Sequence, residues 1–437
     1  MFPCRAFVSL LFVLIVGKGS TAPLVGEEVW DYVEVRDGAH MFWWLYYADS
    51  QSVKYQEVPF VMWLQGGPGG SGSGFGNFGE IGPLDSDLQP RKSSWVKAAS
   101  VLFVDNPVGT GFSYAERPDC YATDIDMVAS DMLVLLKHFF SKMEDFQKIP
   151  FFIFSESYGG KMAAAISLEV TKAVTRGDLR CNFAGVALGD SWISPVDSVM
   201  TWGPYLYATS LLDDNGLNQV KIAAEAVKDA VEQQHFDKAT ELWSVAETVI
   251  EQNTNGVNFY NILSQESDDV SSAGSNLISL LARRHIAPLH KQSLSQLMNG
   301  AIRHKLGIIP QNVTWGGQAE QVFSSMAADF MKPVVHMVDQ LLTAGVNVSV
   351  YNGQLDLIVD TLGQELWLQR LEWAGLPGFN KLRWTALDDP ASPGVTGAFV
   401  KSFQNFSFYW ILKAGHMIPS DQGPMALQMM KMITKQV

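Results

Sequence analysis

The segment Phe151-Phe152-Ile153-Phe154-Ser155-Glu156-Ser157-Tyr158-Gly159-Gly160 runs from four apolar residues directly into a turn centred on a serine. Such an apolar run is typical of a buried strand, and a sharp strand-to-helix turn exposes its central side chain from a strained backbone. Only small neighbours such as Ser155 and Gly159 fit beside that side chain. Ser157 is therefore the candidate nucleophile, and the alternative is a buried strand followed by a helix-capping serine.

A serine hydroxyl needs a histidine to take its proton and a carboxylate to hold that histidine. Of the eight histidines in the chain, only His416 lies near the C-terminus. It follows the strand-like run 406–412, which places its imidazole on a loop at a strand end. His416 is therefore the candidate base, with a structural turn histidine as the alternative.

The matching carboxylate is expected between the serine and the histidine in the chain. Asp356 follows the alternating run 346–351 and is the stronger candidate. Asp360 is expected to cap a helix that begins near Thr361, although spacing alone leaves it open as the acid.

A glycine-rich turn, Trp63-Leu64-Gln65-Gly66-Gly67-Pro68-Gly69-Gly70, follows the apolar run 60–62. Its unobstructed backbone N–H groups suit an oxyanion hole, which stabilises the charge of a tetrahedral intermediate. Glycine-rich turns also bind phosphate, but the lysine of a P-loop is missing and the nearest basic residue is Arg91. Phosphate binding is therefore not expected.

Strands and helices alternate along much of the chain, which predicts an α/β fold with a mostly parallel central sheet and helices on both faces. The clearest helical stretches are Met127 to Lys142 and Lys161 to Thr175. Strand signals vanish between about Thr201 and Met331, where apolar residues recur at helical spacing, so an inserted helical cap is expected there. The expected strands lie near residues 41–47, 58–64, 100–105, 150–154, 183–188, 346–351 and 406–412.

Five segments in chain order resemble the serine carboxypeptidase family of α/β-hydrolases. These segments are spread from residue 63 to residue 419. The segments are Trp63-Leu64-Gln65-Gly66-Gly67-Pro68-Gly69, Asp105-Asn106-Pro107-Val108-Gly109-Thr110-Gly111-Phe112-Ser113-Tyr114, Ser155-Glu156-Ser157-Tyr158-Gly159-Gly160, Gly353-Gln354-Leu355-Asp356 and Ala414-Gly415-His416-Met417-Ile418-Pro419.

The resemblance implies a serine carboxypeptidase with an acyl-enzyme intermediate. It makes Ser157 the nucleophile, His416 the general base and later acid, and Asp356 the orienting carboxylate. The backbone amides of Gly67 and Tyr158 would form the oxyanion hole.

The resemblance also implies a network that binds the free C-terminal carboxylate of the substrate. Gly66, Glu80 and Glu156 match its positions, whereas Gln65 stands where the family has asparagine. The extra methylene of Gln65 moves the amide outward, so the network is expected to hold the substrate carboxylate more loosely or in a shifted position. A glutamate binds a carboxylate only when one of the two is protonated, so an acidic pH optimum is expected.

Two rival functions remain at this point. The same fold and triad serve esterases and acyltransferases, and a non-catalytic binding protein could keep the hydrolase shell. Peptide or protein C-termini are the expected substrate. No cofactor and no metal is expected, and the oligomeric state is left open.

The composition agrees with this interpretation. A chain of 437 residues with 47% hydrophobic residues can bury one large core with an insertion. Its formal net charge is -14, and basic residues form only short pairs such as Arg283-Arg284. Nucleic acid is therefore not an expected partner.

Residues 1–22 are expected to be a secretory signal peptide, because Arg5 precedes the apolar run 7–16 and small residues follow. The expected organisation is a hydrolase core of residues 23–200 and 332–437 and a cap of residues 201–331. The mature protein is expected to lack a membrane span and to be secreted or lysosomal.

Sequons at Asn312, Asn347 and Asn405 support the secretory route. Asn347 lies in an expected core strand, so its glycosylation would require an exposed strand end or edge. Cys120 and Cys181 remain once the leader is removed, and they form either one disulfide or two separate thiols.

Overall fold

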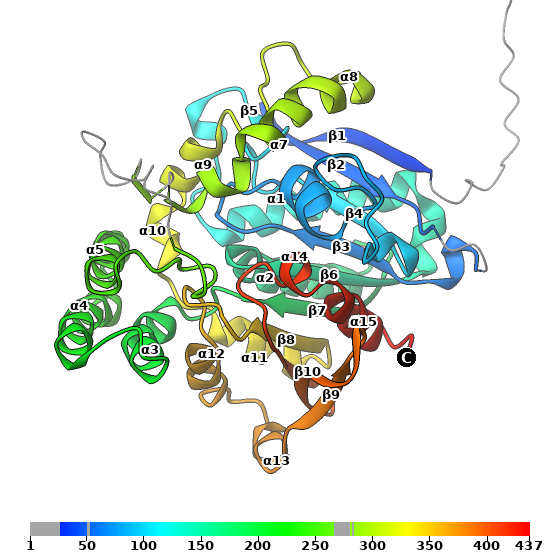
Figure 1. Ribbon diagram of the computed structural model, residues 1–437. Coiled ribbons are helices and arrows are strands. Elements are labelled where there is room, and N and C mark those ends of the chain that lie inside the picture. Colours follow the sequence, from blue (N-terminus) through cyan, green and yellow to red (C-terminus); the bar gives the residue numbers. More distant parts are fainter. Residues whose placement is uncertain (1–26, 50–52, 266–279, 282–283) are drawn as a thin grey trace, which may run out of the picture.

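A computed structural model describes residues 27–49, 53–265, 280–281 and 284–437. The expected signal peptide, residues 1–22, lies outside these ranges. The described strands form one 11-stranded sheet in the order β1-β2-β4-β3-β6-β7-β8-β11-β10-β9, with β5 beside β2 (Figure 1). They are β1 (Glu28–Arg36), β2 (Ala39–Tyr46), β3 (Phe60–Leu64), β4 (Ser100–Val104), β5 (Tyr114–Ala115), β6 (Pro150–Glu156), β7 (Asn182–Gly189), β8 (Asn347–Gly353), β9 (Thr385–Asp389), β10 (Ser392–Phe403) and β11 (Phe406–Ile411).

The centre of the sheet is parallel. Strands β4, β3, β6, β7, β8 and β11 pair parallel to one another, while β1, β2, β5, β10 and β9 pair antiparallel at the two sides. The carboxyl ends of the parallel strands therefore share one edge, where open α/β sheets bind their ligands.

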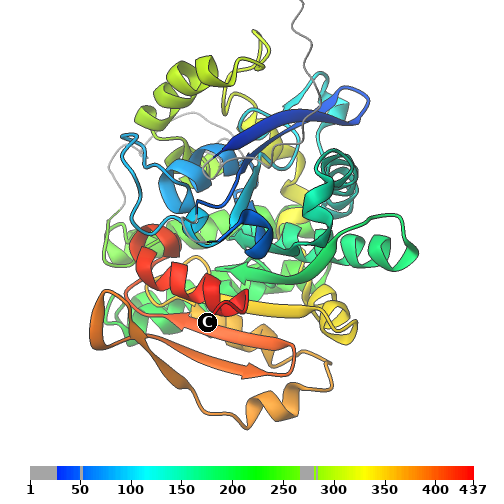
Figure 2. The same ribbon diagram turned by 90° about the vertical axis from the view of Figure 1, so that its right-hand side faces the viewer.

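Both faces of the sheet are covered, which explains why the central strands are apolar throughout. Along β2, Trp43 packs into the core that contains residues of α1 and α2, and its neighbour Trp44 packs into the opposite core with residues of α15. Figure 2 shows the red α15 to the left of the central strands and teal helices to their right. The mostly parallel sheet with helices on both faces confirms the predicted α/β-hydrolase fold.

The helices fill the connections between strands. They are α1 (Ile125–Lys142), α2 (Tyr158–Arg176), α3 (Pro195–Ala208), α4 (Asp214–Glu232), α5 (Phe236–Thr254), α7 (Gln292–Leu297), α8 (Arg303–Leu306), α9 (Ala319–Ser325), α10 (Ala327–Phe330), α11 (Val335–Thr343), α12 (Thr361–Leu368), α13 (Leu376–Asn380), α14 (Ile418–Asp421) and α15 (Gly423–Ile433). A π-helical segment spans Gly72–Ile81. No described helix is both long and apolar enough to cross a membrane.

Every strand and helix that the sequence predicted has a counterpart. The seven strands correspond to β2, β3, β4, β6, β7, β8 and β11, and the two helices to α1 and α2. The sequence analysis missed β1, β5, β9 and β10. The first residues of β10 include Pro393 and Gly394, which are turn signals, and its pairing with β9 is interrupted by register shifts.

The described part of residues 201–331 contains helices and no named strand. In Figure 1, α3, α4 and α5 lie together at one side of the sheet, and α7, α8 and α9 lie above it. Both groups come from the connection between β7 and β8, two neighbouring strands at the centre of the sheet.

Candidate active site

Ser157 lies on a strained turn between β6 and α2. Its backbone has φ 63° and ψ −131°, a combination that non-glycine residues rarely adopt. Its N–H donates to the carbonyl of Gly189 on the neighbouring strand over 2.9 Å. A Cβ at Gly159 would lie 2.3 Å from the carbonyl oxygen of Leu64, so the turn requires glycine there. The geometry is that of a nucleophile elbow.

His416 and Asp356 meet although 60 residues separate them. The His416 Nδ1 and Asp356 Oδ2 atoms are 2.7 Å apart, and both side chains are buried. Asp356 follows β8 and His416 follows β11, and these two strands are paired. The other imidazole nitrogen, Nε2, has no hydrogen-bond partner among the described residues, and the ring lines the same pocket as Ser157.

Burial shifts the pKa of both His416 and Asp356. Burial lowers the pKa of His416, which favours the neutral imidazole that a general base requires. Burial also raises the pKa of Asp356 well above its usual range, and hydrogen bonds from its surroundings oppose that shift.

Asp360 has the capping role that the sequence predicted. Its carboxylate accepts a hydrogen bond from the N–H of Gly363 over 3.0 Å, and α12 begins at the next residue. A second oxygen accepts from the hydroxyl of Thr201. The hydrogen bonds of the Asp360 carboxylate go to Gly363 and Thr201, whereas Asp356 is the carboxylate that the structure brings to His416.

The glycine-rich turn after β3 lies directly against the elbow. A Cβ at Gly66 would be 2.5 Å from the Cβ of Ser157 and 3.0 Å from the backbone nitrogen of Tyr158. Tyr158 is the first residue of α2, so its N–H has no acceptor within the helix. Gly66, Gly67 and Tyr158 therefore line the pocket around the serine.

A chain of hydrogen bonds leads from β3 to the glutamate beside the serine. The Trp63 indole N–H donates to Gln65 Oε1 over 2.8 Å, and Gln65 Nε2 donates to Glu156 Oε1 over 2.7 Å. The carboxyl group of Glu80 interacts with that of Glu156, and neither Glu80 oxygen nor Glu156 Oε2 receives a hydrogen bond from a donor group among the described residues. The longer side chain of Gln65 thus reaches Glu156 and is oriented by Trp63.

A hydrogen bond between two carboxyl groups requires a proton on one of them. Burial raises the pKa of Glu80 to about 7. Burial, followed by the charge of Glu80, raises the pKa of Glu156 well above its usual range. Below about pH 7 this pair holds at least one proton next to Ser157.

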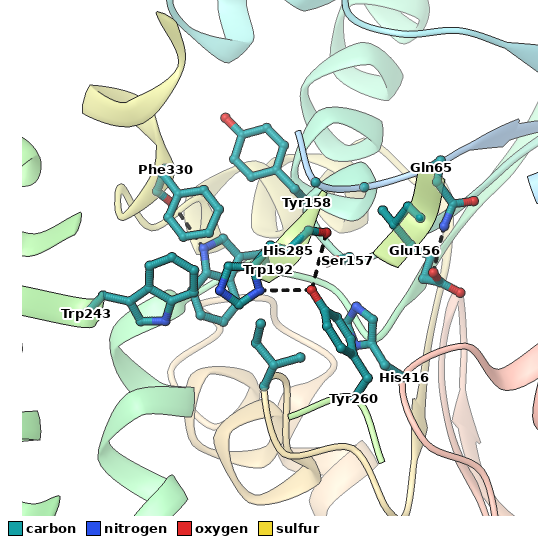
Figure 3. Close-up of a pocket in the computed structure, with 14 residues that line it drawn as sticks. Gln65, Glu156, Ser157, Tyr158, Trp192, Trp243, Tyr260, His285, Phe330 and His416 are labelled. Atoms are coloured by element: carbon teal, nitrogen blue, oxygen red, sulfur yellow. Dashed lines mark hydrogen bonds between the residues drawn. The ribbon is translucent and has the colours of Figure 1, made fainter. Parts of the chain in front are cut away.

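The pocket around Ser157 is largely aromatic (Figure 3). The Phe330 ring stacks on Tyr158 with centroids 5.7 Å apart, and Trp243 lies 4.7 Å from Phe330. Tyr260 lies against His416 with ring centroids 5.2 Å apart, and its carbonyl accepts the backbone N–H of His416. The lining residues are Gln65, Gly66, Gly67, Glu156, Ser157, Tyr158, Trp192, Trp243, Tyr260, His285, Leu289, Phe330, Ile358 and His416.

Several of these lining residues were missed by the sequence analysis. Trp243, Tyr260 and Phe330 lie in the expected helical insertion and border the pocket, although the sequence pattern did not single them out. Helical periodicity marks a side chain as apolar and inward-facing but does not distinguish a core from a pocket wall. No local signal in the sequence would have singled out these three.

The sequons occupy different environments. Asn312 is exposed on a turn. Asn347 begins β8 half-buried, and its amide donates to the carbonyl of Ala184. The Asn405 amide donates to two backbone carbonyls, those of Leu342 and Val346.

Cys120 and Cys181 are both free thiols. Cys120 is buried and Cys181 is half-buried. The stability of the described chain therefore depends on its cores and not on a disulfide between these two residues.

Comparison with known proteins shows to which protein family the chain belongs. The pattern of the family described as "Serine carboxypeptidase" matches residues 19–436, so the chain belongs to the serine carboxypeptidase family. It is 60% identical to the human retinoid-inducible serine carboxypeptidase, with 98% of this chain and 97% of that protein covered. It is also 44% identical to serine carboxypeptidase-like 51 of Arabidopsis thaliana, over 94% of this chain and 92% of that protein.

Among solved structures, the chain resembles the prohormone-processing carboxypeptidase Kex1(delta)p of Saccharomyces cerevisiae. The TM-score is 0.78 at 20% identity, with 94% of this chain and 92% of that chain covered. At that identity the likeness concerns the fold, and it agrees with the sheet described above.

Proposed function

We propose that this serine carboxypeptidase hydrolyses the C-terminal peptide bond of peptides and proteins through Ser157, His416 and Asp356. The observation that carries the proposal is the pair of buried glutamates, Glu80 and Glu156, beside the serine, whose pKa values burial raises. A neutral carboxyl group can donate to a carboxylate, so this pair can recognise a free chain terminus. An esterase or acyltransferase has no need of such a group.

The first half of the reaction forms an acyl-enzyme. His416 Nε2 takes the proton of the Ser157 hydroxyl while the serine oxygen attacks the scissile carbonyl carbon. Asp356 holds the Nδ1–H and stabilises the imidazolium. The N–H groups of Gly67 and Tyr158 stabilise the oxyanion, and His416 then donates its proton to the amine of the leaving amino acid.

The second half releases the shortened peptide. A water molecule gives a proton to His416 Nε2 and attacks the acyl carbon. The second tetrahedral intermediate collapses, the bond to Ser157 breaks, and the serine oxygen recovers its proton from His416. No metal or cofactor takes part in this proposed mechanism.

Substrate binding depends on pH through the glutamate pair. The substrate carboxylate accepts a hydrogen bond from the protonated pair, with Gln65 and the backbone of Gly66 beside it. Ionisation of Glu80 near pH 7 would place a second negative charge against that carboxylate. Activity on free-carboxylate peptides is therefore expected to be highest at acidic pH and to fall as the pH rises through about 7.

An organophosphorus serine probe tests the nucleophile. Labelling is expected for the wild type and should be lost in Ser157→Ala, while Ser155→Ala, two residues away, should still be labelled. Equal labelling of Ser157→Ala and wild type would contradict the proposal.

Matched peptides test the exopeptidase activity. A peptide with a free C-terminus should be hydrolysed much faster than its C-terminal amide. Faster turnover of simple esters, with no preference for the free carboxylate, would favour an esterase or acyltransferase. Labelling without turnover of any of these substrates would favour a binding protein that kept the hydrolase shell.

We also propose that residues 201–331 form a cap that closes the pocket over a core of residues 23–200 and 332–437. Trp243, Tyr260 and His285 support this division because they come from the inserted region and line the pocket with Ser157. They would contact the side chains next to the scissile bond.

The proposed route of the protein is the secretory pathway, to the lysosome or the extracellular space. The acidic working pH and the sequons at Asn312, Asn347 and Asn405 support it. Asn312 is the most accessible acceptor because the amides of the other two donate to backbone carbonyls.

A further inference from the structure

Asp190 is a buried carboxyl group at the active site to which the proposed mechanism assigns no role. It follows the last residue of β7, the strand between those that carry Ser157 and Asp356. Its side chain is 0% exposed. One oxygen, Oδ1, accepts the N–H of Gly353 over 2.7 Å, and the other, Oδ2, receives no hydrogen bond from a donor group among the described residues.

Backbone hydrogen bonds hold Asp190 in a fixed position beside β8. Its backbone adopts φ 41°, a left-handed conformation that aspartate and asparagine tolerate better than most residues. Its N–H donates to the carbonyl of Tyr351 over 2.8 Å. Through Tyr351 and Gly353, Asp190 is bound to the end of β8, from which the turn to Asp356 starts.

Asp190 also lies close to Asp356 and His416. One carboxyl oxygen of Asp190, one of Asp356 and one ring nitrogen of His416 all lie within 4.8 Å of one another. Each carboxyl group shifts the pKa of the other in the direction that a hydrogen bond donated by Asp190 would produce: Asp190 lowers the pKa of Asp356, and Asp356 raises that of Asp190. Such a bond exists only when one of the two holds a proton, because two ionised oxygens repel each other.

The surroundings decide which carboxyl group is ionised. Asp356 accepts from His416 Nδ1 over 2.7 Å and from the N–H of Val359 over 3.2 Å, whereas Asp190 accepts from one backbone N–H. More donors stabilise the charged form, so the charge belongs on Asp356 and the proton on Asp190.

The neighbouring charges agree with this distribution. Burial raises the pKa of Asp190 well above its usual range, and the negative charge of Asp356 adds to the shift. His416 opposes it. Glu156 and Glu80 face this cluster from the substrate side, and Asp360 faces Asp356 from the start of α12.

We propose that Asp190 is a positioning residue whose protonated carboxyl group donates a hydrogen bond to Asp356 and keeps that carboxylate ionised and aimed at His416. This inference rests on the proposed function of Ser157, His416 and Asp356. Its consequence is that Asp356 retains its charge at the acidic pH at which the glutamate pair is protonated.

The test compares two substitutions at the same position. Asp190→Ala removes the donor, so the pKa of Asp356 rises and the acidic limb of activity moves up by about one pH unit. Asp190→Asn supplies an amide N–H to Asp356 and an amide oxygen to Gly353, and it tolerates the same backbone. It is expected to return the limb to within about 0.3 unit of wild type.

The rate of labelling by the serine probe, measured between pH 4 and 8, is the readout. The probe has no carboxylate, so the glutamate pair does not contribute through substrate binding. Asp360→Asn is the matched control, because it neutralises another buried aspartate near Asp356 and keeps a capping side chain. Thermal melts identify a variant that fails to fold.

Three results would overturn the inference. An acidic limb that moves down by about one unit in Asp190→Asn would show that Asp190 is ionised and raises the pKa of His416. Equal limbs in wild type and Asp190→Ala would show that the donor is not needed. Failure of Asp190→Asn to restore the limb would show that hydrogen-bond donation is not what Asp190 supplies.

If Asp190→Ala does not fold, the direction of the Asp190→Asn shift decides alone. A failure of this inference is distinguishable from a failure of the proposed function. In the first case labelling still requires Ser157 and Asp356, and in the second it does not.

Discussion

Two carboxyl pairs lie on either side of the catalytic centre, Glu80 with Glu156 and Asp190 with Asp356. All four side chains are at most 2% exposed, and within each pair the two carboxyl groups shift the pKa of one another. The pairs differ in what surrounds them. Glu156 lines the substrate pocket and accepts from a side chain, Gln65, whereas the aspartates are anchored by backbone N–H groups and by His416.

This difference shows how a buried pair of carboxyl groups can serve two purposes. A carboxyl pair open to a pocket can offer its proton to a ligand, and its binding strength follows the pH. A pair sealed behind a histidine cannot exchange its proton with a ligand, so its proton has a fixed position. Burial raises the pKa in both pairs, and access to the pocket decides the function.

The largest expected effect comes from the Asp190–Asp356 pair, which lies behind His416. Asp356→Asn removes the charge that holds the His416 tautomer, so kcat should fall by about 10³ to 10⁴-fold. Because Asp356 does not line the pocket, KM for a free-carboxylate peptide should change little. Steady-state kinetics at pH 5 on a peptide and an ester measure both quantities.

Asp360→Asn is the control for this substitution. Its capping amide should preserve α12, and kcat should stay within a few-fold of wild type. A similar loss of kcat in both variants would show that the effect of Asp356→Asn is not specific to its contact with His416.

The Glu80–Glu156 pair, which borders the pocket, should give a smaller effect that depends on pH. In the wild type, KM for a free-carboxylate peptide should rise up to about tenfold per pH unit above pH 7, as Glu80 ionises. Glu80→Gln removes the ionising group and should flatten this rise. KM is measured from pH 5 to 8 with the free peptide and with its C-terminal amide.

The amide substrate provides the contrast, since it has no charge for the pair to repel. Its KM should be nearly independent of pH in both proteins. An unchanged pH dependence for the free peptide in Glu80→Gln would contradict the assignment of the pair to the substrate carboxylate.

Replacing Gln65, which connects Trp63 to Glu156, should have a still smaller effect. Gln65→Asn shortens the side chain by one methylene, so one amide can no longer bond both Trp63 and Glu156 at their present positions. We expect a KM increase of about two- to fivefold for free-carboxylate peptides at pH 5, with kcat nearly constant. A fall in kcat without a change in KM would place Gln65 in the chemical step instead.

The smallest expected effect concerns stability. Because the pKa of Glu80 in the folded protein, about 7, lies above its value of 4.5 in an unfolded chain, the folded state binds this proton more tightly. That stabilisation is complete below about pH 4.5 and is lost as the pH rises through 7. The pKa of Asp360 is also raised to about 7, so it contributes in the same direction.

Thermal melts from pH 5 to 8 measure this contribution. The Tm should decrease by a few degrees over that range in the wild type and by less in Glu80→Gln. Glu225→Gln, an exposed carboxylate on α4, is the matched control and should follow the wild type.

Much of the fold and part of the site could be predicted from the sequence. The apolar runs that became β3, β6 and β8 are local signals, and each ends at the residues that form the site. The capping role of Asp360 was also predicted correctly, since a cap depends on the next three residues. The last two strands at one side of the sheet, β10 and β9, were missed, and in β10 a proline and a glycine mimic a turn.

The sequence by itself determined the α/β class, the strained serine turn and the order of serine, aspartate and histidine, because these follow from the nearest neighbours of each residue. Only the tertiary structure decided which aromatic side chains border the pocket and how the four acids pair. Asp190 and Asp356 are separated by 166 positions, and no local pattern connects them. Burial and the distance between charges set the position of a proton, and both arise only when the chain has folded.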